Sequence, residues 1–431
     1  MIAGVGGRLV SHAYVERQLL PSIMAARDPE DRAHERHFFQ WWRRVERALG
    51  PASSARAVLD VGVTPLLTWL GHATSSMTTH GWGLSGVVDG TRTTLVVLPW
   101  SASLDSVWSD VLRAGLASGA RWTLVTNGRA LRFVDGARIW SRQVLECDLG
   151  ALAADPHGAR TLRAFAGADA LGAGSPGSQT LADLVAESDR YAARVCHSLG
   201  DGVLTALPGL IGALASPPAR RAATSDRPFE QALTIVYRVL FLLFAEARGL
   251  VPIGNDVYRE GYTIDALRRR VMERPGARGL WASLQAISRM AHDGCRAGSL
   301  NVTAFNGRLF SPLHAPLVER CVVPDAVTEG VLLALATTAS PNGRQPIAYH
   351  DLGVEQLGSV YERVLEYEPG RAQAAGTLTR TSIERKATGS FYTPRAMTEF
   401  VVRRTLHPLV EGKTASEILA LRLVDPALGS G

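Results

Sequence analysis

The chain has 431 residues, enough for two or three domains with cores of their own, and its 46% hydrophobic and 20% charged content fits a folded globular protein. No apolar run reaches membrane-spanning length without a charge or proline, the N-terminus lacks a signal-peptide pattern, and the four cysteines lack metal-ligand spacing, so we expect a reduced, cytoplasmic protein. The net charge of +6 suits a polyanion such as DNA, but it is modest over this length and genome composition alone can produce it.

Residues 1–150 are expected to form an α/β domain behind a helical start. Residues 1 to about 60 have mainly helical patterns, and His34–Leu49 carries apolar residues at helical spacing. The Trp41–Trp42 and Arg43–Arg44 pairs could form a nucleic-acid surface. We favour a buried stripe beside a solvated face, because that is the commoner origin of such a pattern.

Three strands and a helix are predicted between residues 83 and 147. The Asn-Gly pair at 127–128 stands between two apolar runs, which is a hairpin signal. The predicted elements are the strands Thr93–Leu98, Trp122–Thr126 and Ala130–Val134 and the helix Leu104–Ala117.

The segment Trp122–Phe133 reads Trp-Thr-Leu-Val-Thr-Asn-Gly-Arg-Ala-Leu-Arg-Phe. It resembles the N-terminal nuclease-like domain of type IIG restriction-modification enzymes and type I restriction subunits. The resemblance implies a PD-(D/E)xK fold, in which a preceding strand carries Glu-x-Lys and the carboxylates hold a divalent metal. Here that strand, Leu95–Trp100, has neither a carboxylate nor a lysine, and a hard cation needs oxygen ligands. We expect a degenerate, metal-free domain; an unrelated α/β domain and a nuclease with displaced catalytic residues are the alternatives.

Residues 151–228 read as a linker-rich helical segment without visible chemistry. Gly167–Ser178 and Ser216–Pro228 are rich in linker residues. The intervening stretch, Leu181–Leu199, predicts a helix.

Residues 229–365 are expected to form a helical domain. Ala232–Arg248 is apolar nearly all round, which is typical of a central buried helix, and Gly249 is placed to cap its C-terminus. Glu246 and Arg248 belong to this stretch, and an internal ion pair between them is an alternative to a functional role.

Parts of this helical region resemble segments that recur in type IIG-like adenine methyltransferases. The first is Val236–Pro252, followed in the same order as in that family by Phe305–Phe310 and Leu357–Leu365. Each segment alone could be ordinary core packing, so their order and spacing carry the resemblance.

Residues 366–388 read as a polar linker, and residues 389–431 as the start of a further domain. Thr393 and Pro394 are placed as the N-cap and first residue of a helix to about Leu406. We expect its apolar residues Met397, Phe400 and Val401 to face inward. An apolar strand, Leu421–Val424, then leads into an Asp-Pro turn and a glycine-rich loop, which can approach a ligand closely.

Two motifs in this last part resemble those of type I, type IIG and related N6-adenine methyltransferases. Gly389 and Phe391–Pro394 match Gly-x-Phe/Tyr-Tyr-Thr-Pro, and Asp425–Gly431 matches Asp-Pro-Ala-x-Gly-Ser-Gly, with Leu428 where the family most often has cysteine. The separation from Tyr392 to Asp425 is 425 − 392 = 33 residues, room for a helix, a loop and a strand. The resemblance implies an S-adenosylmethionine site formed by Phe391, Tyr392, Thr393, Pro394, Asp425, Pro426, Ala427, Gly429, Ser430 and Gly431.

The resemblance implies transfer of the cofactor's methyl group to N6 of adenine in double-stranded DNA, with the target base flipped out of the helix. The Asn/Asp-Pro-Pro-Tyr/Phe motif that holds this base in the family does not occur before Gly431, so no catalytic residue is assigned. We expect the N-terminal part of a longer restriction-modification or phage-defence enzyme, with an incomplete Rossmann-like domain and inactive alone. Other subunits of such a system are candidate partners. The alternative is a non-catalytic DNA-binding or scaffold module of such a system.

Overall fold

The computed structural model describes residues 3–25, 31–74, 76–89, 93–172, 179–215, 228–305, 307–340, 343–353, 358, 360, 363–364, 367–369, 378–380 and 395–426. It divides into two compact units, residues 1–193 and 194–431. The division falls inside helix α10 (Leu181–Leu214), which continues well past the predicted end at Leu199.

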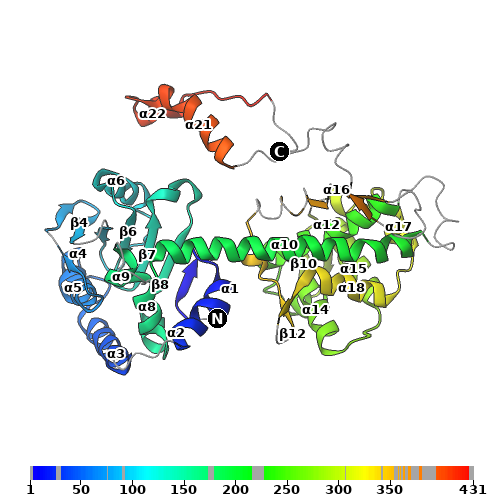
Figure 1. Ribbon diagram of the computed structural model, residues 1–431, viewed down its shortest axis with the longest axis horizontal. Coiled ribbons are helices and arrows are strands. Elements are labelled where there is room, and N and C mark those ends of the chain that lie inside the picture. Colours follow the sequence, from blue (N-terminus) through cyan, green and yellow to red (C-terminus); the bar gives the residue numbers. More distant parts are fainter. Residues whose placement is uncertain are drawn as a thin grey trace. The chain divides into compact units, whose positions relative to one another are not determined.

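Unit 1 is built on one mixed sheet (Figure 1). The strand order is β1-β8-β7-β6-β5-β4-β2, with β3 also paired to β4. Among the described strands of this sheet only β5 and β6 are parallel, and helix α6 (Trp108–Ser118) lies between them in sequence. The strands are β1 (Val5–Gly7), β2 (Ala73–Thr74), β3 (Thr78–His80), β4 (Gly83–Asp89), β5 (Thr93–Val97), β6 (Trp122–Thr126), β7 (Ala130–Asp135) and β8 (Val144–Asp148).

Both faces of the central strands are buried, which explains why β5 and β6 consist of apolar residues and threonines and lack a regular polar alternation. On β5, Leu95 and Val97 pack into the larger core, while Val96 packs into a smaller cluster with Val111 of α6. In Figure 1, α6 lies above the strands and α3 and α8 below them. The remaining helices of this unit are α1 (His12–Tyr14), α2 (Leu20–Ala25), α3 (Asp31–Ala48), α4 (Ala55–Ala57), α5 (Thr64–Trp69), α7 (Leu149–Ala154), α8 (Gly158–Ala166) and α9 (Ala168–Leu171), with π-helical turns at Val15–Leu19 and Val58–Val63 and a 3-10 turn at Gly136–Ser141.

The predicted hairpin is confirmed. β6 and β7 pair antiparallel, and Asn127 Oδ1 accepts hydrogen bonds from the backbone N–H groups of Arg129 and Ala130, both at 3.0 Å. Gly128 has φ +85°, a conformation that disfavours any residue with a Cβ atom. The turn chemistry of the Asn-Gly pair therefore fixes this part of the sheet.

Three expectations for unit 1 were wrong. The helix predicted from Leu104 begins at Trp108, after a turn. The N-terminal stretch is not wholly helical, because β1 pairs antiparallel with β8, about 140 residues away. The proposed linker at 167–178 contains α9, whose Ala168 N–H donates to Leu70 O at 2.9 Å, so residues 167–172 belong to the folded core.

Unit 2 is mainly helical around α12 (Pro228–Ala247), as predicted. This helix is long and apolar enough to span a membrane, but 61% of its apolar window is buried within the protein, as in the core helix of a globular fold. Gly249, at φ +64°, ends it, and the Leu250 N–H donates to Ala245 O at 2.9 Å. Packed around α12 are α13 (Asp256–Gly261), α14 (Ile264–Glu273), α15 (Leu280–Asp293), α16 (Gly307–Phe310), α17 (Pro316–Arg320) and α18 (Asp325–Ala336), with a 3-10 turn at Tyr349–Asp351.

Short strand pairs complete unit 2. The predicted linker 366–388 contains one of them, β13 with β14, so it is not wholly irregular. The pairs are β9 (Cys295–Ala297) with β10 (Leu300–Val302), β11 (Thr337–Ser340) with β12 (Gly343–Pro346), and β13 (Tyr367–Pro369) with β14 (Leu378–Arg380); α21 (Arg395–Val410) and α22 (Ala415–Leu419) follow. The fold is thus mixed α/β in unit 1 and mainly helical in unit 2.

Candidate functional site

Most of the predicted cofactor site lies outside the described residues. This applies to Phe391, Tyr392, Thr393, Pro394, Ala427, Gly429, Ser430 and Gly431. Asp425 and Pro426 are described, and both are exposed in the chain after α22. The described residues therefore include one end of the predicted site but not its two facing segments together.

Helix α21 begins at Arg395, directly after the predicted Thr393–Pro394 start signal, and it extends past Leu406 to Val410. The inward orientation expected for its apolar residues was wrong, because Met397, Phe400 and Val401 are 58%, 65% and 55% exposed. Their apolar surface is left largely uncovered by the part of the chain that the structure describes.

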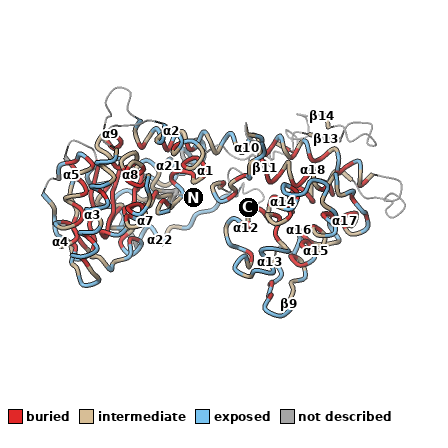
Figure 2. The backbone as a smooth tube through the Cα atoms, turned by 90° about the horizontal axis from the view of Figure 1, so that it is seen from below, coloured by how far each residue is buried: buried red, intermediate tan, exposed pale blue. Residues whose placement is uncertain are grey.

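Leu421–Val424 does not form the predicted strand. An isolated strand leaves its N–H and C=O groups without ladder partners, so a parallel strand needs neighbours. The Leu421 N–H instead donates to Ile418 O at 3.2 Å, in the turn that ends α22. Leu423 and Val424 are 64% and 86% exposed, and Figure 2 colours this stretch mainly as exposed.

The strand that would carry a nuclease site is a core strand. Val96, Val97 and Leu98 are fully buried, and the Leu98 N–H donates to Thr126 O at 2.8 Å. Trp100 follows, with the Arg129 guanidinium 5.9 Å from its ring. None of these side chains offers an oxygen ligand, and the described residues contain no group of three His, Cys, Asp or Glu side chains able to hold a metal ion.

An open pocket of about 580 Å³, lined by more apolar than polar surface, lies beside this strand, between β3, β4 and α6. His80 Nε2 and Ser85 Oγ are hydrogen-bonded at 2.7 Å, and the His80 ring stacks on Trp82 with centroids 4.7 Å apart. Asp110 and Arg113 form an ion pair at 3.0 Å on the rim. No sequence signal marked this pocket, because its residues come from β3, β4, β5, α6 and the turns beside them and match no motif. It can hydrogen-bond a polar molecule, but its one carboxylate makes it a poor site for a hard cation.

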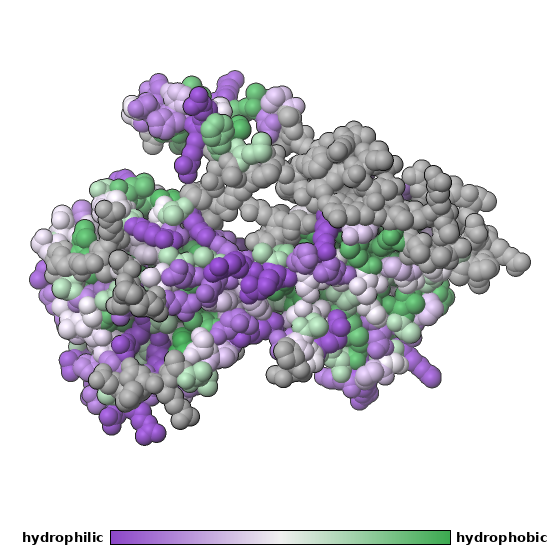
Figure 3. All heavy atoms as spheres, in the orientation of Figure 1, coloured by the Kyte–Doolittle hydropathy of each residue, from purple (hydrophilic) through white to green (hydrophobic). Residues whose placement is uncertain are grey.

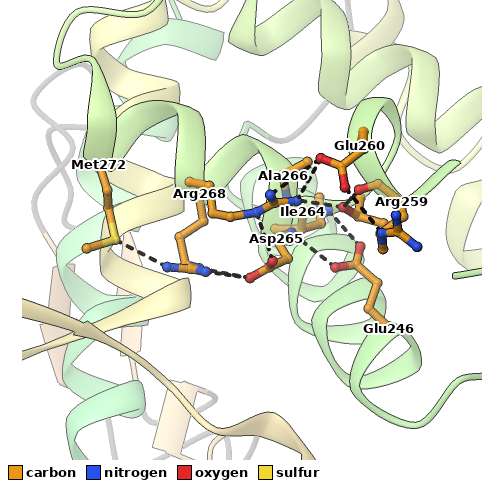
Figure 4. A network of polar contacts seen from close by, with 10 residues as sticks. Glu246, Arg259, Glu260, Ile264, Asp265, Ala266, Arg268 and Met272 are labelled. Atoms are coloured by element: carbon orange, nitrogen blue, oxygen red, sulfur yellow. Dashed lines mark hydrogen bonds and ion pairs between the residues drawn. The ribbon is translucent and has the colours of Figure 1, made fainter. Parts of the chain in front are cut away.

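Among the described carboxylates of unit 2, Glu246 in α12 has a pKa that burial shifts well above its usual value (Figure 4). Its two oxygens accept the backbone N–H groups of Ile264 at 2.6 Å and Asp265 at 3.1 Å, the first two residues of α14. Burial raises the pKa of Glu246 to about 7, against the two hydrogen bonds, which lower it. The group acts as a buried helix cap.

The ion pair between Glu246 and Arg248, left open as an alternative by the sequence, does not form. Arg248 Nη2 donates to Leu352 O at 2.6 Å, and its guanidinium lies 4.9 Å from the ring centroid of Phe244. The cause is that Glu246 faces the start of α14, where two backbone donors need an acceptor.

Comparison with known proteins gives no match: no family model, no curated protein and no solved structure is similar to this chain.

Proposed function

We propose that this chain is the N-terminal part of an S-adenosylmethionine-dependent, adenine-specific DNA methyltransferase of a restriction-modification or phage-defence system. The observation that carries the proposal is the pair of motifs, Gly389 with Phe391–Pro394 and Asp425–Gly431, at a spacing of 33 residues. A Gly-Ser-Gly turn alone would be weak evidence, whereas the two motifs in this order are far more specific.

In this proposal the backbone amides of residues 427–431 approach the methionine part of the cofactor. Asp425 accepts a hydrogen bond from the cofactor's ammonium group, and Tyr392, Thr393 and Pro394 form the facing wall. The cofactor supplies the sulfonium methyl group, and this chain's residues bind and orient it. No residue of this chain is assigned to the transfer step.

The exposed apolar residues of α21 and of the stretch after α22 support this assignment. Phe400, Leu423 and Val424 are each more than 60% exposed. Such surface is costly to leave in water, at about 25 cal/mol per Å². We propose that it is covered by the remaining strands and helices of a Rossmann-like methyltransferase domain, and that Leu421–Val424 becomes a strand in that sheet.

For unit 1 we propose a PD-(D/E)xK nuclease-like domain that has lost its catalytic residues. The proposal is supported by the mixed sheet, in which α6 connects the parallel strands β5 and β6, and by the apolar sequence of β5 where the acids would stand. The alternative for the whole chain is a non-catalytic DNA-binding or scaffold module, which is favoured by the +6 charge and the lack of a metal-holding group among the described residues.

Titration calorimetry with S-adenosylmethionine tests the proposed cofactor site. We expect residues 1–431 alone to bind the cofactor very weakly and the full product of the gene to bind it tightly. Asp425→Ala should then weaken binding strongly, whereas Glu411→Ala, an equal charge change in the same exposed segment, should not. Tight binding by residues 1–431, or an Asp425→Ala variant that binds normally, would show that the pocket lies elsewhere.

A further inference from the structure

Helix α3 carries a stripe of arginines on its solvent face. Arg32, Arg36, Arg43 and Arg47 are all exposed. In a helix with 3.6 residues per turn, positions 4, 11 and 15 residues apart fall within about 60° of one another. The stripe extends over about 22 Å, since each of the 15 steps rises 1.5 Å. We call these four residues the α3 stripe; Figure 3 shows hydrophilic side chains at the lower left, where α3 lies.

The α3 stripe keeps its positive charge, because nearby acids are paired with an arginine outside the stripe. Two of the acids of α3, Asp31 and Glu35, are paired with Arg160 of α8, each at 3.2 Å. Within the stripe, Arg43 has an ion pair with Glu46, which is long, at 3.8 Å, and half exposed. No described residue forms a side-chain hydrogen bond or ion pair with Arg32, Arg36 or Arg47. The charge of the stripe is therefore available to an outside partner.

The opposite face of α3 holds the helix in place. Phe38, Trp41 and Val45 are buried in the core of unit 1, as the sequence pattern predicted, and Trp41 Nε1 donates to Gly62 O at 2.9 Å. Because the apolar face is already buried, the helix cannot insert it into a membrane. Phe39, 50% exposed, is the large apolar residue at the edge of the stripe.

We propose that the α3 stripe binds the phosphate backbone of double-stranded DNA. Duplex DNA carries about one negative charge per 1.7 Å of its axis, so four guanidinium groups spread over about 22 Å can each meet a phosphate. Guanidinium groups suit phosphate because they donate two parallel hydrogen bonds. A fixed helix with a solvent-facing row of such groups binds the phosphate backbone irrespective of the base sequence. The choice of DNA as the partner rests on the proposed function, whereas the existence of the positive surface does not depend on it.

The test compares two variants that lose the same charge. The first replaces the stripe: Arg32→Gln, Arg36→Gln, Arg43→Gln and Arg47→Gln. The control replaces four exposed arginines of unit 2: Arg274→Gln, Arg278→Gln, Arg296→Gln and Arg308→Gln. Glutamine is nearly as good a helix former as arginine, so α3 should stay folded, which circular dichroism verifies.

Binding to a fluorescent duplex of about 30 base pairs is measured by anisotropy over a range of salt concentrations, without cofactor. The slope of log affinity against log salt should become shallower by about 3 to 4 in the stripe variant, since each lost phosphate contact contributes about 0.9. The control should change it by less than about 1. Equal effects of the two variants, or no effect of the first, would overturn the proposal.

Competition identifies the partner. Unlabelled duplex should displace the probe from the wild type, whereas stronger displacement by single-stranded RNA or by vesicles of phosphatidylserine and phosphatidylcholine would contradict the choice of DNA. Because no S-adenosylmethionine is present, these outcomes are independent of whether the proposed cofactor site exists.

Discussion

Replacing Glu246 by glutamine should remove a pH-dependent contribution to the stability of unit 2. The carboxylate caps α14 from a position that is 9% exposed, and burial raises its pKa from 4.5 to about 7. The rise from 4.5 to about 7 corresponds to about 3 kcal/mol. Glutamine keeps one acceptor oxygen but cannot titrate, so the comparison isolates this effect.

The sign follows from proton binding. Between pH 4.5 and about 7 the folded chain holds the proton on Glu246 and the unfolded chain does not. The stabilising contribution is therefore complete below pH 4.5 and is lost as the pH rises through about 7. The difference in free energy of unfolding, wild type minus Glu246→Gln, should fall by about 3 kcal/mol from about pH 4.5 to 8.

Hydrogen exchange in urea, read on peptides that cover α14, measures this difference for unit 2 alone. Asp325→Asn is the matched control, since Asp325 accepts N–H groups from Gly279, Leu280 and Trp281 at the start of α15. Partial burial raises the pKa of Asp325, but these hydrogen bonds outweigh the burial and lower the pKa overall. The contribution of Asp325 to stability is therefore lost only in acid. A Glu246→Gln difference that stays constant with pH, or grows with it, would refute the reasoning.

Two further predictions concern unit 1. The protein should not cut or nick DNA with magnesium or manganese, because β5 offers no carboxylate; metal-dependent cleavage by a homogeneous preparation would contradict this. Gly128→Ala should lower the free energy of unfolding, measured by thermal denaturation, by about 1–3 kcal/mol. The backbone φ is +85°, and the new Cβ would lie 3.0 Å from Val58 and 3.1 Å from Trp100. Gly119→Ala, at φ +62° with no described atom within 4 Å, should cost less, and equal losses would remove the steric part of the argument.

Local signals predicted local structure well. β6 and the hairpin follow from a run of strand-forming residues and an Asn-Gly turn, and α12 follows from an unbroken apolar sequence. The pairing of β1 with β8 could not be predicted. β1 has three residues, two of them glycine, so it lacks a local strand signal and forms only by pairing with a distant strand. The role of Glu246 could not be predicted either. Its carboxylate accepts a backbone N–H group at the start of α14, which lies beside α12 only in the folded protein.

The candidate site was predictable only as motifs. The residues around Asp425 indicate a cofactor loop by their order, while the exposure of Met397 and Phe400 depends on what covers α21. The hydrogen bond in the pocket beside β5 arises from strand register, which places Thr78 opposite Ser85 and brings His80 within reach of Ser85. No periodicity in the sequence reveals such a cross-strand arrangement.

Methyl transfer to DNA tests the central claim most directly. The full product of the gene is incubated with S-adenosylmethionine and duplex DNA, and N6-methyladenine is measured by mass spectrometry of the digested DNA. We predict N6-methyladenine with the wild type, a strong loss with Asp425→Ala, and wild-type levels with Glu411→Ala. No methylated adenine with any duplex tested, or full activity in the Asp425→Ala variant, would contradict the account.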